Sequence, residues 1–334
     1  MSTLPSQVWK NTSNYHLEVL RNPWYRAVAR LQNSISELTL DYWRARGGQT
    51  LHLPVTTGSI SSPMGRGSDS LPVSVDLMGA PTYLADSMQF MLEFGCRLTG
   101  TDAYYVMPSF RGEDADATHL CQFFHSEAEI VGGLDEMMAT VEDYLRQLAA
   151  GLLERDASVV EGCGGDLTRL ERLASGQQFR RITFDEAAEL LGGAGIEDQG
   201  GWRTLTREGE RLLMDKLGEF LWVTHWDHLA VPFYQAFGDP EGRTALNADL
   251  LFGMGEVVGA GERHVTAEDV RRALDLHQVD AEAYGWYLEM RDFAPLRTSG
   301  FGLGIERFLM WVLDHDDIRD FQLLPRRNGH NIVP

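Results

Sequence analysis

The chain has 334 residues, 43% of them apolar and 10% aromatic, which is enough for a substantial core and argues against disorder. Acidic residues outnumber basic ones 49 to 29, and the formal charge of −20 disfavours a sequence-independent grip on a nucleic-acid backbone, so we expect no DNA partner. Three widely spaced cysteines, an N-terminus without a signal-peptide pattern and no window apolar enough to cross a membrane favour a cytoplasmic protein with no membrane partner.

The first strong periodicity along the chain is helical and runs from Pro23 to Arg46. Apolar residues recur there at steps of three and four, which is typical of one face of an amphipathic helix, and two glycines follow where it should end. The next segments read as strands at 51–55, 72–77, 82–90 and 103–110, followed by a long helix at 133–156.

Residues 150–218 are mostly short helical pieces broken by glycine, and we interpret them as a helical insertion. Strand patterns return after it, at 220–226, 231–237, 244–261 and 299–304. The order of strands, helical insertion and strands, without regular βαβ alternation, predicts an α+β fold. We therefore expect one domain over residues 1–334, with a largely antiparallel sheet flanked by helices.

The segment "SGFGLGIERFLMW", residues 299–311, places glycines at three alternate positions and then Glu306 and Arg307 at the start of an apolar helix. It is not a dinucleotide-binding fingerprint, which needs G-x-G-x-x-G in the first βα turn, and it lacks the Gly-Lys-Ser/Thr of a P-loop. The glycines alone fit two explanations equally well: a nucleotide that approaches the backbone, or a helix packed tightly on a strand.

The segment "PSFRGEDADATHLCQFFHSEAEI", residues 108–130, combines Arg111 and Glu113 with His119 and Phe123. A guanidinium offers planar, permanently charged donors for phosphate oxygens, and an aromatic ring can stack on a purine. Taken singly, each of these residues is better explained by packing or by solvation. Their combination with the segment at 299–311 is what points to a nucleotide.

Together, "FRGE…HLCQF" and "GFGLGIERFLMW" resemble motifs 2 and 3 of the class II aminoacyl-tRNA synthetases, in the aspartyl/asparaginyl subgroup. The segments "NADLLFGMGEVVGAGERH" and "TYLADSMQFMLE" are similar to the rest of that subgroup's active site. The long helix from Pro23 and the following "LHLPV" are similar to motif 1, the dimer element. The resemblance covers essentially the whole chain and implies the class II fold and a homodimer.

The resemblance implies an ATP site with Mg²⁺. By it, Arg111 holds the α-phosphate and Arg307 covers the other adenine face or the γ-phosphate. The remaining nucleotide residues would be Glu113 and His119 at the adenine and γ-phosphate ends, Phe123 stacked on adenine, and Gly302 and Gly304, which let the backbone approach. The Mg²⁺-ATP acids would be Asp249 and Glu256, because hard oxygen ligands suit magnesium.

For the amino acid, the resemblance implies that Gln89 and Glu127 bind the α-ammonium group and that Arg263 reaches the side-chain oxygen. Aspartyl enzymes place a lysine three residues after the matching glutamine, whereas this chain has Leu92 followed by Glu93. That is similar to the asparaginyl pattern, in which an acid accepts from a carboxamide and repels a carboxylate. The chain also departs from the subgroup at three positions: it has Thr298 where a histidine is usual, Thr118 where an arginine is usual and Gln122 where an acid is usual.

Three functional hypotheses follow. With only about twenty residues ahead of the motif 1 helix, we expect no anticodon-binding β-barrel, a situation similar to stand-alone paralogues such as archaeal-type asparagine synthetases. We therefore favour a ligase that forms an aminoacyl adenylate from an Asp/Asn-like amino acid and transfers it to ammonia or another small amine without tRNA. The second hypothesis is a truncated synthetase that charges a tRNA or a carrier protein. The third is a non-catalytic regulator, against which the retained arginines and acids argue.

Overall fold

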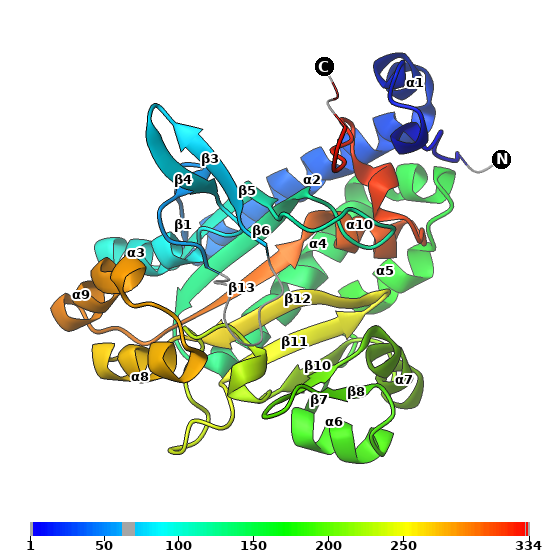
Figure 1. Cartoon of the computed structure of the whole chain (residues 1–334). Helices are drawn as coiled ribbons and strands as arrows, with labels where there is room; N and C mark the ends of the chain where they lie inside the picture. Colours follow the sequence, from blue (N-terminus) through cyan, green and yellow to red (C-terminus); the bar gives the residue numbers. More distant parts are fainter. Residues whose placement is uncertain (1–2, 62–70, 331, 333–334) are drawn as a thin grey trace.

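The computed structural model describes residues 3–61, 71–330 and 332 (Figure 1). Its centre is an eight-stranded sheet in which the two edge pairs are parallel and every inner pair is antiparallel. In spatial order the strands are β1 (Gln49–Thr50), β5 (Ala103–Phe110), β6 (Gln122–Val131), β13 (Thr298–Gly304), β12 (Gly255–Glu262), β11 (Asn247–Phe252), β10 (Leu221–Thr224) and β7 (Arg180–Thr183). This arrangement confirms the predicted α+β fold with a largely antiparallel sheet.

Two long helices, α2 (Pro23–Arg46) and α4 (Leu134–Gly162), pack on each other, and α4 covers β11, β12 and β13 (Figure 1). The predicted bounds of α2 are confirmed: the Asn22 side chain accepts from the Trp24 amide at its start, and Gly47 ends it in the left-handed conformation with φ 78°. Under these helices the ring of Trp43 stacks on Phe301 with centroids 6.3 Å apart.

The side chains of β13 divide between the two faces of the sheet. Phe301 and Leu303 are buried in the core with the helices. Because side chains alternate along a strand, the three glycines between and beside them turn to the opposite face. The glycine-rich strand thus presents apolar side chains to the helices. Its opposite face has only backbone at the glycines, so it can form the floor of a site.

Outside the segment 150–218, the further α-helices are α1 (Tyr15–Arg21), α3 (Gln89–Thr99), α8 (Ala267–His277), α9 (Gly285–Phe293) and α10 (Ile305–Val312). A second sheet contains β2 (Thr56–Thr57), β3 (Val73–Leu77) and β4 (Ala80–Leu84). None of the helices in the described part of the chain has the length and apolar character needed to cross a membrane. The expected strand at 82–90 is only half correct, because β4 ends at Leu84 and Gln89 opens α3. The segments 51–55 and 231–237 form no strand.

The segment 150–218 is mostly helical, as expected, but it also contains three strands. Its first part is the end of α4, and it continues through α5 (Leu167–Ala174), α6 (Phe184–Leu191), the hairpin of β8 (Ile196–Asp198) and β9 (Arg203–Leu205), and α7 (Arg207–Leu217). Between α5 and α6 it contributes β7, which pairs with β10 and so extends the main sheet. The insertion is therefore built into the edge of the sheet and packs beside β11 and β12 through α7.

Candidate active site

Two adjoining pockets lie over the glycine-bearing face of the sheet. The first pocket has a volume of about 280 Å³ and is lined by Arg111, Glu113, Thr118, His119, Leu120, Phe123, His125, Glu256, Val257, Gly302, Gly304, Glu306, Arg307 and Ile318. The second pocket is lined on its polar side by Ser61, Asp86, Ser87, Gln89, Glu127, Tyr234, Gln235, Asn247, Asp249 and Arg263. The two pockets share Arg111, His125, Glu256 and Gly302. A ligand spanning both would therefore pass Arg111.

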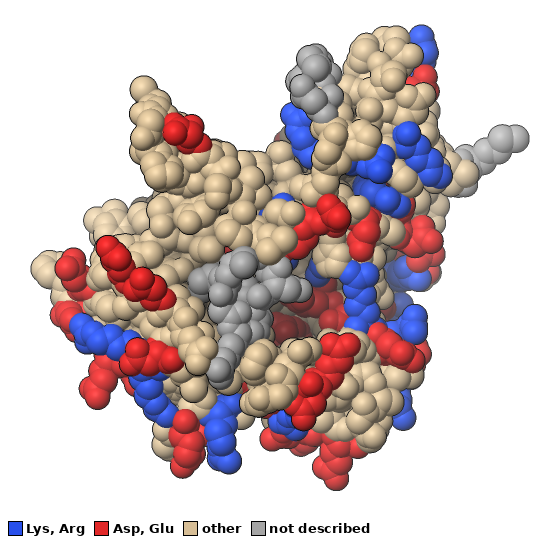
Figure 2. All heavy atoms as spheres, in the orientation of Figure 1, with Lys and Arg blue, Asp and Glu red and all other residues tan. Residues whose placement is uncertain are grey.

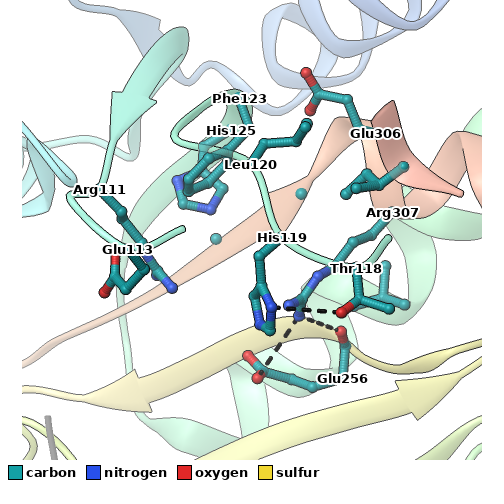
Figure 3. Close-up of a pocket in the computed structure, with 14 residues that line it drawn as sticks. Arg111, Glu113, Thr118, His119, Leu120, Phe123, His125, Glu256, Glu306 and Arg307 are labelled. Atoms are coloured by element: carbon teal, nitrogen blue, oxygen red, sulfur yellow. Dashed lines mark hydrogen bonds and ion pairs between the residues drawn. The ribbon is translucent and has the colours of Figure 1, made fainter. Parts of the chain in front are cut away.

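Two guanidiniums face the first pocket from different elements. Arg111 follows β5, and its guanidinium lies over the ring of Phe123, 5.4 Å from the ring centroid. Arg307 lies in the first turn of α10 and donates from Nη1 to the backbone oxygen of Glu256 at 2.7 Å. Figure 3 shows these two arginines on opposite sides of the cavity, with His119 between them. An anion in the pocket would thus meet positive charge from both sides.

Three buried polar atoms at the two pockets have no hydrogen-bond partner among the described residues: Nε of Arg111, Oε2 of Glu113 and Nε2 of Gln89. A buried polar group left unpaired costs about 1–3 kcal/mol, so groups of this kind in a pocket usually serve a ligand. The donors suit phosphate or carboxylate oxygens, and the Glu113 acceptor suits an exocyclic amine such as that of adenine. The residues therefore fit ATP.

The acids expected to hold magnesium lie on neighbouring strands, Asp249 on β11 and Glu256 on β12. Both carboxylates lie above Gly259, because a Cβ atom there would be 3.2 Å from Glu256 Oε1 and 3.8 Å from Asp249 Oδ1. Burial and the adjacent carboxylates of Glu256 and Glu210 raise the pKa of Asp249 well above its usual range. This crowding of negative charge fits a divalent cation, which would relieve it.

No group of three or more His, Cys, Asp or Glu residues in the described ranges has the arrangement of an all-protein metal site. Two carboxylates are what a magnesium ion needs when phosphates and water supply its other ligands. The pair formed by Asp249 and Glu256 therefore fits a Mg²⁺ ion that arrives with a nucleotide.

The insertion adds two side chains that the sequence analysis missed. Glu210 of α7 accepts from the backbone amide of Glu256 at 3.3 Å, and burial together with the nearby Glu256 carboxylate raises its pKa to about 7. Arg207, one turn earlier, donates to Nδ1 of His119 at 2.8 Å. Neither residue belongs to a recognisable motif, because both depend on how α7 docks and not on local spacing.

The floor of the second pocket is a buried ion pair. Arg263 donates to Glu129 from Nε at 3.2 Å and from Nη2 at 3.1 Å, and its Nη1 donates to Oε1 of Gln235 at 3.2 Å. Gly300 makes room for this pair, because a Cβ atom there would collide with both Glu129 and Arg263. Glu129 thus balances the charge of Arg263 within the protein. At this floor the second pocket offers a ligand polar atoms and not the free charge of Arg263.

Glu127 lies at the side of the second pocket near the start of α3. Its Oε2 accepts from the hydroxyl of Ser87 at 2.6 Å and also from Tyr105. Burial raises the pKa of Glu127 to about 8. A bound ammonium group would stabilise the ionised form, so this carboxyl is suited to the substrate's α-amino end together with Gln89.

The sequence analysis expected Glu93 to contact the substrate, but the structure places its side chain elsewhere. Glu93 lines neither pocket: its carboxylate is fully buried and accepts from Arg291 Nη2 at 2.6 Å and from the Tyr287 hydroxyl at 2.5 Å. Gln89 and Glu93 share a face of α3, but Glu93 lies one turn further along the helix, where Arg291 and Tyr287 of α9 cover it. The other twelve residues expected at the site all line one or both pockets.

This architecture was compared with known families and structures. A family model described as tRNA synthetases class II (D, K and N) matches residues 10–328. The chain belongs to this family. It is accordingly a synthetase-like, ATP-dependent ligase of the asparaginyl/aspartyl type, as the two sequence motifs predicted.

Individual members of the family span most of the chain. An asparagine–tRNA ligase of Sorangium cellulosum is 29% identical over 322 residues, which cover 92% of this chain and 70% of the relative. One of Koribacter versatilis is 28% identical over 94% of this chain and 72% of the relative. A crystal structure of asparaginyl-tRNA synthetase from Pyrococcus horikoshii complexed with asparaginyl-adenylate superposes with a TM-score of 0.85 at 25% identity, covering 96% of this chain and 73% of that one.

Proposed function

We propose that this class II synthetase-like protein activates asparagine with ATP, forming asparaginyl adenylate and pyrophosphate, and transfers the asparaginyl group to the acceptor end of a tRNA. The observation that supports this most directly is the junction of the two pockets at Arg111. A nucleotide in the first pocket and an amino acid in the second would meet there, which is where an acyl-phosphate bond has to form.

The adenylation step needs little more than position and charge. With the amino acid held by Gln89 and Glu127, its carboxylate approaches the α-phosphorus beside Arg111. The guanidiniums of Arg111 and Arg307 neutralise charge that develops on the phosphates, from opposite sides of the pocket (Figure 3). When bound at Asp249 and Glu256, Mg²⁺ neutralises further phosphate charge. No nucleophile from the protein takes part.

The preference for asparagine over aspartate rests on charge balance in the second pocket. Because Glu129 already neutralises Arg263, a side-chain carboxylate placed against Arg263 would gain no free cation there and would lie in a pocket with the acidic side chains of Asp86 and Glu127. A carboxamide carries no charge and can use the polar surface of Gln235. The names of the similar proteins point the same way.

For the acceptor, we now place a tRNA ahead of ammonia or another small amine. The sequence analysis favoured ammonia or a small amine, whereas the relatives described above are named as tRNA ligases. Basic side chains also gather near α1 and the C-terminal segment on the face shown in Figure 2. There, Lys10 and Arg319 lie over the ring of Trp9, 5.0 and 3.6 Å from its centroid, and Asn328 bonds the loop after Arg111. A nucleic-acid end reaching the first pocket would meet this patch, which supports a tRNA.

The test is amino-acid-dependent exchange between ATP and pyrophosphate without an acceptor, over the standard amino acids. We expect exchange with asparagine and little with aspartate. Loading of tRNA in a following assay would support the acceptor proposed here, and product formed only with ammonia or another amine would restore the tRNA-independent ligase. Absence of exchange with every amino acid, with and without tRNA, would contradict the proposed function. Dimerisation through α2 and a cytoplasmic location remain predictions.

A further inference from the structure

His125 occupies a place that the adenylation step does not use. It lies on β6 and is one of the four residues that line both pockets. Its side chain is only 14% exposed, and its ring packs edge-on against Phe123 with centroids 4.7 Å apart. Figure 3 shows the imidazole directed towards the cavity between Arg111 and His119. A buried histidine at the junction of two ligand pockets calls for a chemical explanation.

The two ring nitrogens of His125 have different surroundings. Nδ1 lies 2.8 Å from the hydroxyl of Ser109, with which it forms a hydrogen bond, and 3.0 Å from Oε1 of Glu127. No described residue forms a hydrogen bond with Nε2. When Glu127 is ionised, as a bound ammonium group favours, a proton on Nδ1 faces these two oxygens and the Nε2 lone pair is free. The strand pairing of β5 with β6 places Ser109 and Glu127 beside this nitrogen, and the orienting carboxylate then favours the Nδ1–H tautomer.

The charges around His125 change when the site is filled. In the free protein, burial and the guanidiniums of Arg111 and Arg307 lower its pKa to about 3, so the ring is neutral. The same two guanidiniums are the groups that a bound phosphate neutralises, while the carboxyl of Glu127 stays beside Nδ1. Phosphate bound to these guanidiniums would remove part of this lowering, so we expect a neutral ring in the free protein and a higher pKa of His125 beside the adenylate.

We propose that His125 is the general base of the transfer step, accepting a proton at Nε2 from the acceptor group that attacks the adenylate. In that step the acceptor's nitrogen or oxygen forms a bond to the acyl carbon, and the bond between that carbon and the phosphate oxygen breaks. AMP leaves with the electron pair, and the acceptor's proton passes to Nε2 and then to water. This inference rests on the proposed function, because it requires an adenylate in the site.

The experiment compares two amines on preformed enzyme-bound adenylate. Only the unprotonated fraction of methylamine can attack, and its nitrogen must pass a proton to a base as the new bond forms, whereas hydroxylamine is unprotonated at neutral pH and intrinsically reactive. In His125→Gln we expect attack by methylamine to slow by about 100-fold, within the usual range for loss of a general base. Attack by hydroxylamine should slow by less than about tenfold. The matched control is His16→Gln, an exposed histidine on α1.

The outcomes separate the inference from the proposed function. Equal slowing of both amines would mean that His125 only positions the adenylate and would overturn the inference, as would no slowing of methylamine. Absence of adenylate in the wild-type protein would overturn the proposed function and the inference with it. If His125→Gln does not fold, Ser109→Ala keeps the imidazole but removes one of the two oxygens beside Nδ1 and leaves Glu127 as the other. The pH profile of methylamine attack should then shift relative to wild type, and an unchanged profile would overturn the inference.

Discussion

The first and second pockets use arginine in opposite ways. In the first, Arg111 has a buried Nε without a partner in the described part of the chain, and Arg307 is bonded mainly to a backbone oxygen. In the second, Arg263 is held by Glu129 on two of its nitrogens. Free guanidiniums attract highly charged phosphates, whereas a balanced one shapes a pocket for a neutral group. Under the proposed function, the first pocket would supply charge to the nucleotide and the second would discriminate between amino acids.

The largest effect should come from removing a free guanidinium. Arg111→Ala should lower the rate of ATP–pyrophosphate exchange by about 10³-fold, because charge developing at the α-phosphate loses its nearest donor. The matched control is Arg169→Ala, which removes an arginine whose partner, Asp314, is largely exposed. An exchange rate in Arg111→Ala close to that of the control would contradict the role of an unpaired guanidinium in the first pocket.

A different effect is expected when Arg263 loses its carboxylate partner. Glu129→Gln leaves Arg263 charged and unpaired in a buried position, so we expect a loss of about 3–5 kcal/mol in the free energy of unfolding. The freed guanidinium should also attract a carboxylate, so the ratio of exchange with aspartate to exchange with asparagine should rise. Denaturant unfolding and the two exchange rates measure these effects. An unchanged ratio would mean that Glu129 does not set the charge selectivity.

Glu127 should make the stability of the free protein depend on pH. Its pKa in the folded chain is raised by burial from 4.5 to about 8, so the folded state holds this proton more tightly than the unfolded state does. The stabilisation is present at low pH and is lost as the pH rises through this interval. Glu127→Gln should flatten the fall in melting temperature between about pH 5 and pH 8. Parallel curves for wild type and variant would contradict this.

The smallest effect is expected at the rim of the first pocket. Arg207→Ala removes the donor to His119 and should raise the KM for ATP by about threefold to tenfold, as the loss of one partly exposed hydrogen bond does. The KM for asparagine should stay unchanged. Arg211→Ala, which removes an exposed arginine of the same helix, is the control. Equal changes in the two variants would show that α7 has no specific role at the nucleotide.

The residues that the sequence analysis expected at the nucleotide all line the first pocket, because they lie in short, ordered segments. Arg111, Phe123 and the glycines of β13 are each fixed by a strand or turn next to them, so spacing along the chain translates into position. The bounds of α2 were predictable for a similar reason, since apolar periodicity and Gly47 mark them locally.

The amino-acid side was less predictable because it depends on packing between distant segments. Glu93 follows Gln89 by four residues, yet helix α3 carries it away from the pocket to Arg291, a partner 198 residues along the chain. His125 had no motif to mark it, and Glu210 reaches the site only through the docking of α7. Their positions depend on tertiary contacts that no local pattern contains.

The parallel pairing of β7 with β10 has a further consequence for engineering. Removal of residues 180–218 would expose the backbone donors and acceptors of β10 along an open edge, which is a template for association between chains. The same removal would take away the helix that carries Glu210. It would also remove Phe184 and Leu213 from an apolar cluster and so expose its remaining members, which include Leu221, Val223 and Leu251. Shortened forms of the protein should therefore aggregate, so a minimal catalytic version has to keep this segment or replace it with another edge strand.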